Sequence, residues 1–244
     1  MLMSEILTDA QISEHPKIPK RNFLVLGIDD SGRGPVIGPM IMAGVLIDSE
    51  LENELRELGV RDSKLITPRR REILAEIIKK KALSYHIVII SASEVDAYVK
   101  SVNINTLEAK KSGQIINQIN KGLDKIKVVV DCPSPNITKW RNVLLTYIKN
   151  IKNLELICEH KADRNHIAVG AASILAKSAR EKEVKKIKKK LGIEFGSGYS
   201  SDPRTREFLD KFSKKHDGDG IFRKSWQTWK NHIGKKQQKK LDSF

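Results

Sequence analysis

The segment from Phe23 to Pro39 constrains this chain more than any other. It begins with the apolar run Phe23–Leu26 and soon reaches two adjacent acids, Asp29 and Asp30. A short apolar run of this kind predicts a buried strand. Two carboxylates at the end of such a strand repel each other and lose hydration, which raises their pKa values unless a cation neutralises them. Because Mg²⁺ and Mn²⁺ prefer carboxylate oxygens, the pair suggests a divalent-metal site.

Two glycines follow the acids and flank Arg33. Gly32 and Gly34 leave the backbone bare, so another backbone can approach closely. The Arg33 guanidinium is a permanently charged fork suited to phosphate. Metal-binding acids beside a phosphate-sized opening indicate phosphodiester chemistry. The alternative is a tight strand–turn–strand with a solvated Asp pair, whereas a dinucleotide-binding loop does not match the spacing G-x-G-x-x-x-G with Pro35 inside it.

The composition favours one large domain with a nucleic-acid partner. The chain has 244 residues, is 39% hydrophobic and carries a formal net charge of +15. This charge indicates a polyanionic ligand, and no lipid-anchor motif or long apolar run favours a membrane. Cys132 and Cys158 lack zinc-ligand spacing, so we expect reduced thiols in a cytoplasmic protein. Residues 1–20 are polar and predict a flexible arm rather than a signal peptide.

Hydrophobic periodicity predicts a mixed α/β sheet. Apolar runs predict strands within 36–47 and at 85–90, 127–131 and 154–158, and helical spacing predicts helices at 50–58, 67–81, 105–120, 138–148, 166–191 and 203–214. Thr67 and Pro68 are an N-cap and a first-turn proline. Small residues at 170–173 would let the long helix lie close to the sheet.

Four acids share a position at or just beyond the carboxyl end of a predicted strand: Asp29, Asp30, Asp131 and Asp163. Ligands of open α/β sheets bind at that edge. The four carboxylates could hold two divalent ions about 3.5–4 Å apart, the arrangement used for in-line phosphoryl displacement. Taken singly, Asp131 or Asp163 is better explained as a strand-end or helix N-cap residue, whereas the set of four favours catalysis.

Seven motifs occur in one order: GIDDSGRGPVIGP (27–39), RDSKLITPRRRE (61–72), VVVDCPSP (128–135), HKAD (160–163), AASILAKSARE (171–181), GSGYSSDPRT (196–205) and RKSWQT (223–228). On these motifs, the chain from Leu26 to its C-terminus resembles type 2 ribonuclease H (ribonuclease HII) in its archaeal form. The resemblance implies a ribonuclease H-like fold, a five-stranded mixed sheet flanked by helices, with a helical C-terminal extension. We therefore expect a catalytic domain at 21–192, an extension packed on it at 193–236 and a tail at 237–244.

The resemblance implies an endoribonuclease. It would hydrolyse the RNA strand of RNA–DNA hybrids and cut 5′ of ribonucleotides embedded in duplex DNA, leaving a 3′-OH and a 5′-phosphate. The family's Asp-Glu-Asp-Asp set, with two Mg²⁺ or Mn²⁺ ions, corresponds to Asp29, Asp30, Asp131 and Asp163. Asp30 stands where the family usually has the longer Glu. We expect activity to survive, because a water can bridge a short carboxylate to Mg²⁺; the alternative is a hybrid-binding protein with impaired catalysis.

The resemblance also implies substrate contacts. The turn Gly32–Gly34 is expected to contact the 2′-OH of the ribonucleotide and neighbouring phosphates, since bare backbone amides can recognise the group that distinguishes RNA from DNA. Tyr199 resembles the family's tyrosine that stacks on the next sugar. Lys64 and Ser173 are expected to contact phosphates, although Ser173 could equally be a packing residue. A nuclease of this fold acting on DNA junctions is the rival, which the Gly-Arg-Gly turn and Tyr199 disfavour.

The lysines, tryptophans and histidines of the C-terminal half each allow a functional and a structural interpretation. The lysine-rich segment 185–190 predicts either a solvated helix end or a surface that steers a duplex. Trp226 and Trp229 are three residues apart, which favours the core of a small helical lobe over base stacking. His160 and His166 flank Asp163, but a metal-activated water needs no histidine base, so neither is assigned to catalysis.

The last seven residues have the form Q-x-x-L-x-x-F, with Gln238, Leu241 and Phe244 at its defining positions. This pattern resembles the sliding-clamp-binding motif of replication and repair proteins. Leu241 and Phe244 would anchor a short turn in a hydrophobic pocket. A plain charged tail is the alternative. Nothing in the sequence requires a partner subunit, so we expect a monomer.

Overall fold

The strand that carries the two adjacent acids lies in the middle of the sheet. β1 (Leu24–Ser31) pairs antiparallel with β2 (Met40–Ile47), which pairs antiparallel with β3 (Ser84–Ile90). On its other side β1 pairs in parallel with β4 (Ile126–Asp131), and β4 pairs in parallel with β5 (Leu154–Glu159). The order is β3-β2-β1-β4-β5, which confirms the predicted five-stranded mixed sheet. The computed structural model describes residues 23–60 and 66–241.

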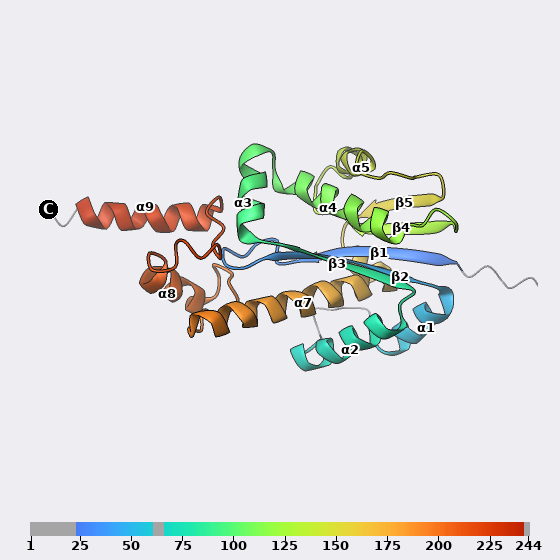
Figure 1. Cartoon of the computed structure of the whole chain (residues 1–244), viewed down its shortest axis with the longest axis horizontal. Helices are drawn as coiled ribbons and strands as arrows, with labels where there is room; N and C mark the ends of the chain where they lie inside the picture. Colours follow the sequence, from blue (N-terminus) through green and yellow to red (C-terminus); the bar gives the residue numbers. More distant parts are fainter. Residues whose placement is uncertain (1–22, 61–65, 242–244) are drawn as a thin grey trace, which may run out of the picture.

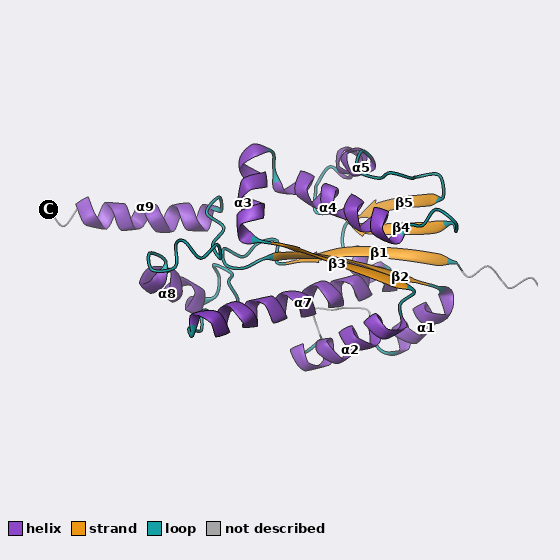
Figure 2. Cartoon of the chain, viewed as in Figure 1, coloured by secondary structure: helices purple, strands orange, loops and turns teal. Residues whose placement is uncertain are grey.

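Helices cover both faces of the sheet (Figures 1 and 2). One face is covered by α1 (Ser49–Glu57), α2 (Pro68–Lys81) and α7 (Ile167–Leu191), and the other by α3 (Ala92–Ser101), α4 (Ile104–Ile119) and α5 (Ile137–Leu145). The one-turn helix α6 (Ala162–Asn165) precedes α7. The sequence prediction missed α3 and α6 and assigned no helix to the segment Gln227–Leu241, but it located the other helices within a few residues of their ends. Thr67 caps α2 as predicted, since its side chain accepts from the Arg70 N–H.

The alternation of β1 separates its side chains between two cores. Val25 packs in the core beneath α7, whereas Leu26 and Ile28 pack in the core beneath α4. Successive side chains of a strand point to opposite faces of its sheet. Asp29 and Asp30 continue this alternation, so Asp29 points towards the α7 side and Asp30 towards the α4 side. The two acids therefore meet different neighbours although they are adjacent in sequence.

The close packing of α7 on the sheet depends on Gly27. A Cβ at Gly27 would lie 2.1 Å from the backbone carbonyl carbon of Ala168. The predicted small residues behave differently, because a Cβ at Gly170 would meet the Val60 carbonyl oxygen at 2.8 Å and no atom of the sheet. The helix does lie close to the sheet, as predicted, but the glycine that allows it belongs to β1.

The C-terminal extension packs against the connection between β1 and β2. Its core contains Phe195, Phe208 and Trp229, and Val36 and Ile37 of the connection join the same cluster. The extension contains α8 (Pro203–Phe212) and α9 (Gln227–Leu241), which lie at one end of the molecule (Figure 1). Backbone hydrogen bonds join the extension to the connection. The Gly38 N–H donates to the Ile221 carbonyl oxygen at 2.8 Å, and the Arg223 N–H donates to the Val36 carbonyl oxygen at 2.9 Å.

Two sequence predictions for the extension need adjustment. Trp229 is a core residue, as predicted, but Trp226 turns away from the helical lobe and donates its indole N–H to the Gly34 carbonyl oxygen at 3.1 Å. In addition, α9 runs on to Leu241, so the expected boundary between residues 236 and 237 falls inside a helix. In the described part of the chain, we find no helix with the length and apolarity that membrane crossing requires.

We expect Gly27→Ala to destabilise the protein by about 3 kcal/mol or more, because neither backbone can yield without moving α7 off the sheet. Urea unfolding followed by circular dichroism measures this. Gly218→Ala is the matched control, since a Cβ there would meet nothing within 4 Å. Equal stability of the two variants would contradict this account of the packing.

Candidate active site

Asp29 lies in a buried pocket between β1 and α7. Its side chain is 7% exposed, and one carboxylate oxygen accepts from the Asp30 N–H at 2.7 Å. Ser173 of α7 also hydrogen-bonds to this carboxylate. Burial raises the pKa of Asp29 well above its usual value, and the negative charges of Asp30 and Asp131 raise it further. The sequence analysis allowed Ser173 to be either a phosphate contact or a packing residue. The structure places it beside the carboxylates.

Asp30 faces the opposite side of the sheet and a different set of charges. Burial raises its pKa to about 7, and the negative charge of Glu108 acts in the same direction. Arg33 and Lys177 partly offset this by lowering the pKa of Asp30. Asp131 also raises it, which shows that Asp30 and Asp131 are within electrostatic reach of each other.

Asp131 and Asp163 complete the predicted group of acids. Asp131 ends β4, and its carboxylate accepts from the Ala162 N–H at 3.0 Å. Burial raises the pKa of Asp131, and the charge of Asp163 raises it further. Lys161, the residue before α6, has a left-handed φ of 58°. This turn brings Asp163, which is 6% exposed, back towards the end of β4.

The four acids suit a divalent cation by their chemistry. The pKa values of Asp29, Asp30 and Asp131 rise because burial and mutual repulsion both oppose ionisation, and a bound cation would reverse both effects. Carboxylate oxygens are also the ligands that Mg²⁺ and Mn²⁺ prefer. Within residues 23–60 and 66–241, no three His, Cys, Asp or Glu side chains are already gathered into a metal cage.

Glu108 of α4 is a site residue that the sequence analysis missed. It is 1% exposed and accepts a salt bridge of 2.7 Å from the Arg33 Nε. Burial raises its pKa to about 7, although Arg33 lowers it. Arg33 also donates to the Asn105 side-chain oxygen at 2.6 Å. The Arg33 side chain, expected to be free for phosphate, is thus held against α4.

One row of α7 faces the acids. Ser173, Lys177 and Arg180 follow each other at spacings of four and three residues, which places them on one side of the helix. Ser173 bonds to Asp29, and Lys177 acts on Asp30. Arg180 donates to the Ser197 carbonyl oxygen at 2.9 Å, and its guanidinium carbon lies 5.2 Å from the centre of the Tyr199 ring. The sequence placed this row in a helix motif but did not indicate that Lys177 and Arg180 face the site.

The glycine turn after β1 is held by the buried guanidinium of Arg223. This side chain is 0% exposed and donates to the carbonyl oxygens of Gly32 at 2.7 Å, Arg33 at 2.7 Å and Gly38 at 3.1 Å. Gly32 has a φ of 83°, and a Cβ there would lie 2.3 Å from the Arg180 Nε. Gly32 is therefore required by the fold itself.

Fixing these carbonyls also fixes the amides that follow them. In a trans peptide the C=O and the next N–H point in opposite directions. The Gly32 and Arg33 carbonyls point at Arg223, so the N–H groups of Arg33 and Gly34 point away from it. Neither N–H has a hydrogen-bond acceptor among the described residues. The turn therefore presents two free backbone donors.

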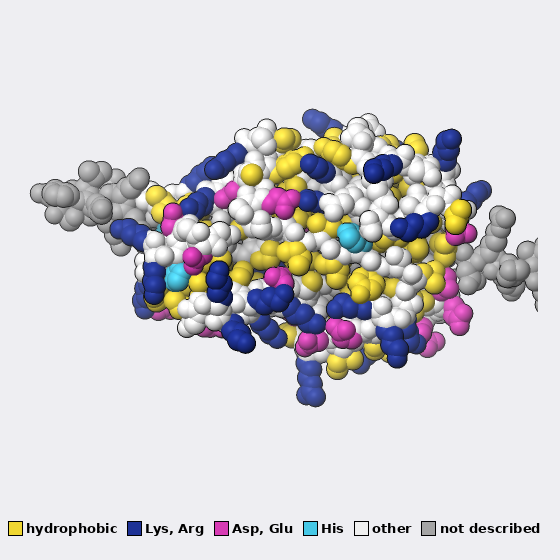
Figure 3. Space-filling model, viewed as in Figure 1, with side chains coloured by type: hydrophobic (Ala, Val, Ile, Leu, Met, Phe, Trp, Pro, Cys, Tyr) yellow, Lys and Arg dark blue, Asp and Glu magenta, His cyan; other side chains and the backbone are white. Residues whose placement is uncertain are grey.

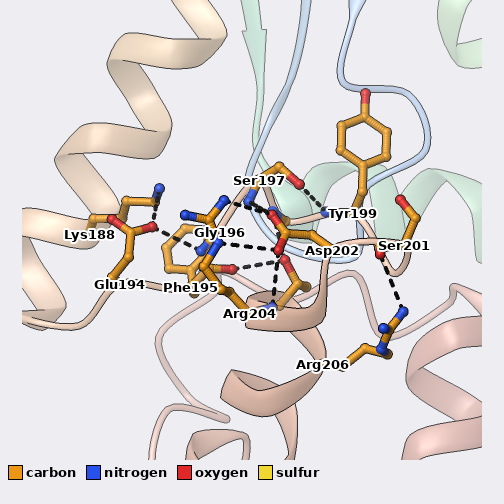
Figure 4. Close-up of polar contacts among 12 residues, drawn as sticks. Lys188, Glu194, Phe195, Gly196, Ser197, Tyr199, Ser201, Asp202, Arg204 and Arg206 are labelled. Atoms are coloured by element: carbon orange, nitrogen blue, oxygen red, sulfur yellow. Dashed lines mark hydrogen bonds and ion pairs between the residues drawn. The ribbon is translucent and has the colours of Figure 1, made fainter.

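Tyr199 is presented by a loop that Asp202 organises (Figure 4). The Asp202 carboxylate accepts from the Ser197 N–H at 2.8 Å and the Arg204 N–H at 3.0 Å. These bonds hold the pKa of Asp202 well below its usual value. The Tyr199 ring points away from this network and is 38% exposed. A Cβ at Gly34 would lie 3.5 Å from the ring, so the free turn amides and the tyrosine border the same space.

The structure describes only some of the remaining candidate residues. Lys64 and Phe244 lie outside the described residues, and Gln238 and Leu241 are in the last turns of α9. His160 Nδ1 is 2.9 Å from the Cys132 carbonyl oxygen, and His166 Nε2 is 3.0 Å from Glu159. Both histidines thus have structural partners. Cys132 and Cys158 are free thiols.

Comparisons with known proteins concern the family and the fold of the chain. A family model described as Ribonuclease HII matches residues 26–229. Ribonuclease HII of Methanosarcina barkeri is 38% identical over 86% of this chain and 95% of its own length. The crystal structure of ribonuclease H2 from Pyrococcus horikoshii OT3 is similar with a TM-score of 0.78 and 35% identity, covering 87% of this chain and 98% of that one. The structure of the PCNA:RNase HII complex from Archaeoglobus fulgidus is similar with a TM-score of 0.74 and 36% identity, covering 84% and 96%.

We expect the metal-free protein to lose stability as the pH rises through the titration of Asp30. The folded state holds this proton up to about pH 7, whereas the carboxyl group has an ordinary pKa of 3.8. Between these values the folded state binds more protons than the unfolded state, so the free energy of unfolding falls with rising pH. Asp30→Asn removes this contribution, and its stability relative to the parent should increase from pH 4 to pH 8.

Urea unfolding in chelator at several pH values measures this difference. Asp124→Asn, which changes an exposed acid far from the cluster, serves as the control. A stability difference between Asp30→Asn and the parent that stays constant across the range would refute this assignment.

Proposed function

The chain belongs to the ribonuclease HII family of nucleases, and on that premise we propose that it hydrolyses the RNA strand of RNA–DNA hybrids and cuts 5′ of ribonucleotides embedded in duplex DNA. The products would be a 3′-OH and a 5′-phosphate. The observation that carries this proposal is the pair of free amides at Arg33 and Gly34, which border the space between the acids and the Tyr199 ring.

Asp29, Asp30, Asp131 and Asp163 would hold two divalent ions, Mg²⁺ or Mn²⁺. When bound, such ions supply an activated water and neutralise charge on the leaving oxygen. The fit rests on the donor chemistry and on the raised pKa values of three of these acids. Ser173 would keep Asp29 oriented, and Lys177 would moderate the charge around Asp30.

The turn amides and Tyr199 would select the ribonucleotide. A backbone N–H can donate to a 2′-OH, which DNA lacks, and the rigid turn would hold both donors in place before substrate arrives. The exposed Tyr199 ring would stack on the adjacent sugar, with the Arg180 guanidinium packed near it. The Arg33 side chain is paired with Glu108, so in this proposal Arg33 acts through its backbone.

A hybrid-binding protein with impaired catalysis is the second candidate, because Asp30 is shorter than the family's usual Glu. The structure adds Glu108 to this region, a further carboxylate close enough to raise the pKa of Asp30. The acidic character of the region is thus not reduced. We therefore favour the active enzyme.

The first test is cleavage of an end-labelled DNA duplex that carries one internal ribonucleotide, with Mg²⁺ and Mn²⁺ in separate reactions. We expect a single cut 5′ of the ribonucleotide. Asp29→Asn should lower the rate by roughly 10³-fold or more, because a metal-ligand charge contributes several kcal/mol. Asp124→Asn is the matched control and should cleave like the parent. Binding without cleavage in either ion would favour the impaired protein, and cutting of an all-DNA junction would favour a junction nuclease.

We expect Gly34→Ala to fold normally and to cleave poorly. The added methyl group would make an ordinary contact of 3.5 Å with Tyr199, but it would occupy the space in front of the free amides. Its kcat/KM for the single-ribonucleotide duplex should fall about tenfold, which corresponds to roughly 1.4 kcal/mol. An unchanged kcat/KM would show that substrate does not enter this space.

We also propose that the C-terminal motif binds the sliding clamp. The Archaeoglobus fulgidus relative forms a complex with PCNA. In this chain α9 extends to Leu241, so Gln238 and Leu241 are three residues apart in the final helical turns. Deletion of residues 238–244 should abolish binding to the clamp, measured by calorimetry, and leave cleavage of the single-ribonucleotide duplex unchanged. Undiminished clamp affinity after the deletion would rule out the motif.

A further inference from the structure

A basic cleft lies beside the proposed active site, between the start of α2 and the C-terminal half of α7. Its volume is about 560 Å³, and the loop at Gly196 and Ser197 borders it. Six cationic side chains line it: Arg69, Arg180, Lys182, Lys185, Lys188 and Arg204. Two acids, Glu72 and Glu181, also line it. The cleft therefore carries a clear excess of positive charge, and Lys and Arg side chains gather over α7 and α2 in Figure 3.

Ion pairs already occupy several of these charges. Glu72 is paired with Lys182 at 3.5 Å, and Glu181 with Arg71, so both acids of the cleft are neutralised. Lys188 is paired with Glu194 of the adjoining loop. These ion pairs reduce the number of unpaired positive charges on the walls of the cleft.

Arg204 is paired with Asp202 at 3.3 Å, and Arg180 donates to the Ser197 carbonyl oxygen. Two cations of the six are left over. Arg69 on the first turn of α2 and Lys185 on α7 are exposed, and neither has an ion-pair or hydrogen-bond partner among the described residues. They project from the two helices that form opposite walls of the cleft. An anion in the cleft would meet both of them without breaking an existing pair.

The cleft is continuous with the proposed active site through Arg180 and Ser197. Both residues line the cleft. Arg180 also packs near the Tyr199 ring and closely beside Gly32 of the glycine turn. Its Nε is buried without a hydrogen-bond partner. A strand that passed Tyr199 would therefore reach Arg180 and then the mouth of the cleft.

The lining favours a sugar–phosphate backbone over bases. No aromatic side chain is found among the described residues that line the cleft, so it offers no stacking surface for a base. Apart from Glu72 and Glu181, which are paired, its polar side chains are cations and hydroxyls, which are the usual partners of phosphate oxygens. Contacts of this kind position a duplex without selecting its sequence.

We propose that this cleft binds the sugar–phosphate backbone of the duplex beyond the point of cleavage, with Arg69 and Lys185 each neutralising a phosphate. The position of the cleavage point rests on the function proposed above. The binding itself does not, because it requires neither a ribonucleotide nor a metal. In this proposal Lys185 and Lys188 of the lysine-rich segment 185–190 face the duplex. This corresponds to the second of the two sequence interpretations, a surface that steers a duplex.

The test is the salt dependence of binding to a fluorescent all-DNA duplex in chelator, measured by anisotropy. For B-DNA the slope of log affinity against log salt changes by about 0.9 for each neutralised phosphate. We expect the double variant Arg69→Ala/Lys185→Ala to bind more weakly and to have a slope about 1.8 smaller in magnitude. The control is Lys125→Ala/Lys152→Ala, which removes the same charge from exposed positions at the opposite end of the sheet and should retain the parent slope.

A second measurement locates the contact on the substrate. Single-ribonucleotide duplexes are shortened from one end or the other, and kcat/KM is measured for the parent and the double variant. We expect the defect of the variant to disappear when one particular flank is removed and to persist when the other is removed.

An unchanged salt slope, or the same change in the control variant, would overturn the proposal while leaving the cleavage function intact. A reduced slope in a protein that cleaves no ribonucleotide substrate would support the cleft and refute the function. The two proposals can therefore fail separately.

Discussion

The buried guanidinium of Arg223 joins the two parts of the molecule on which the candidate site depends. It comes from the C-terminal extension and bonds to three carbonyl oxygens of the connection between β1 and β2. Burial lowers its pKa to about 10, so the side chain remains cationic at neutral pH. The donors of a guanidinium are spread over three nitrogens in a rigid plane, so it can reach carbonyls that lie farther apart than the donors of a single ammonium nitrogen can reach. The hydrogen bonds to the three carbonyl oxygens thus stabilise the buried positive charge of Arg223, and the same bonds fix the shape of the turn.

The position of Arg223 is itself fixed by Asp96 of α3. The Asp96 carboxylate accepts from the backbone N–H groups of Lys224 at 2.6 Å and Ser225 at 2.9 Å. The chain after Arg223 is therefore attached to one side of the catalytic sheet, and Trp226 stacks near the Arg223 guanidinium with its centroid 5.1 Å away. The glycine turn, the extension and α3 form one connected unit. The direction of the free turn amides is set by residues outside the turn.

The sequence predicted the parts of this site that depend on local pattern. The acids were found because Asp29, Asp30 and Asp131 end apolar runs, and the carboxyl ends of parallel strands share one edge of a sheet. Glu108 was missed because a charged residue within a helical pattern resembles a solvated one, and its partner Arg33 is 75 residues away. Arg223 and Arg33 are 190 residues apart, so no spacing rule could connect them. Alternation along β1 could have indicated that Asp29 and Asp30 meet different helices, but the identity of those helices required the tertiary structure.

The central claim is that Arg223 holds the glycine turn in its working shape. Hydrogen exchange of the amides at Val36, Ile37 and Gly38, all bonded across to the extension, measures this directly in Arg223→Lys. The control is Arg206→Lys, which alters an exposed arginine bonded to the carbonyls of Ser200 and Ser201. The account predicts at least about 100-fold faster exchange at these three amides in Arg223→Lys, because the ammonium cannot reproduce the three guanidinium hydrogen bonds, with slower cleavage and an otherwise unchanged sheet. Exchange and cleavage equal to the parent would contradict it.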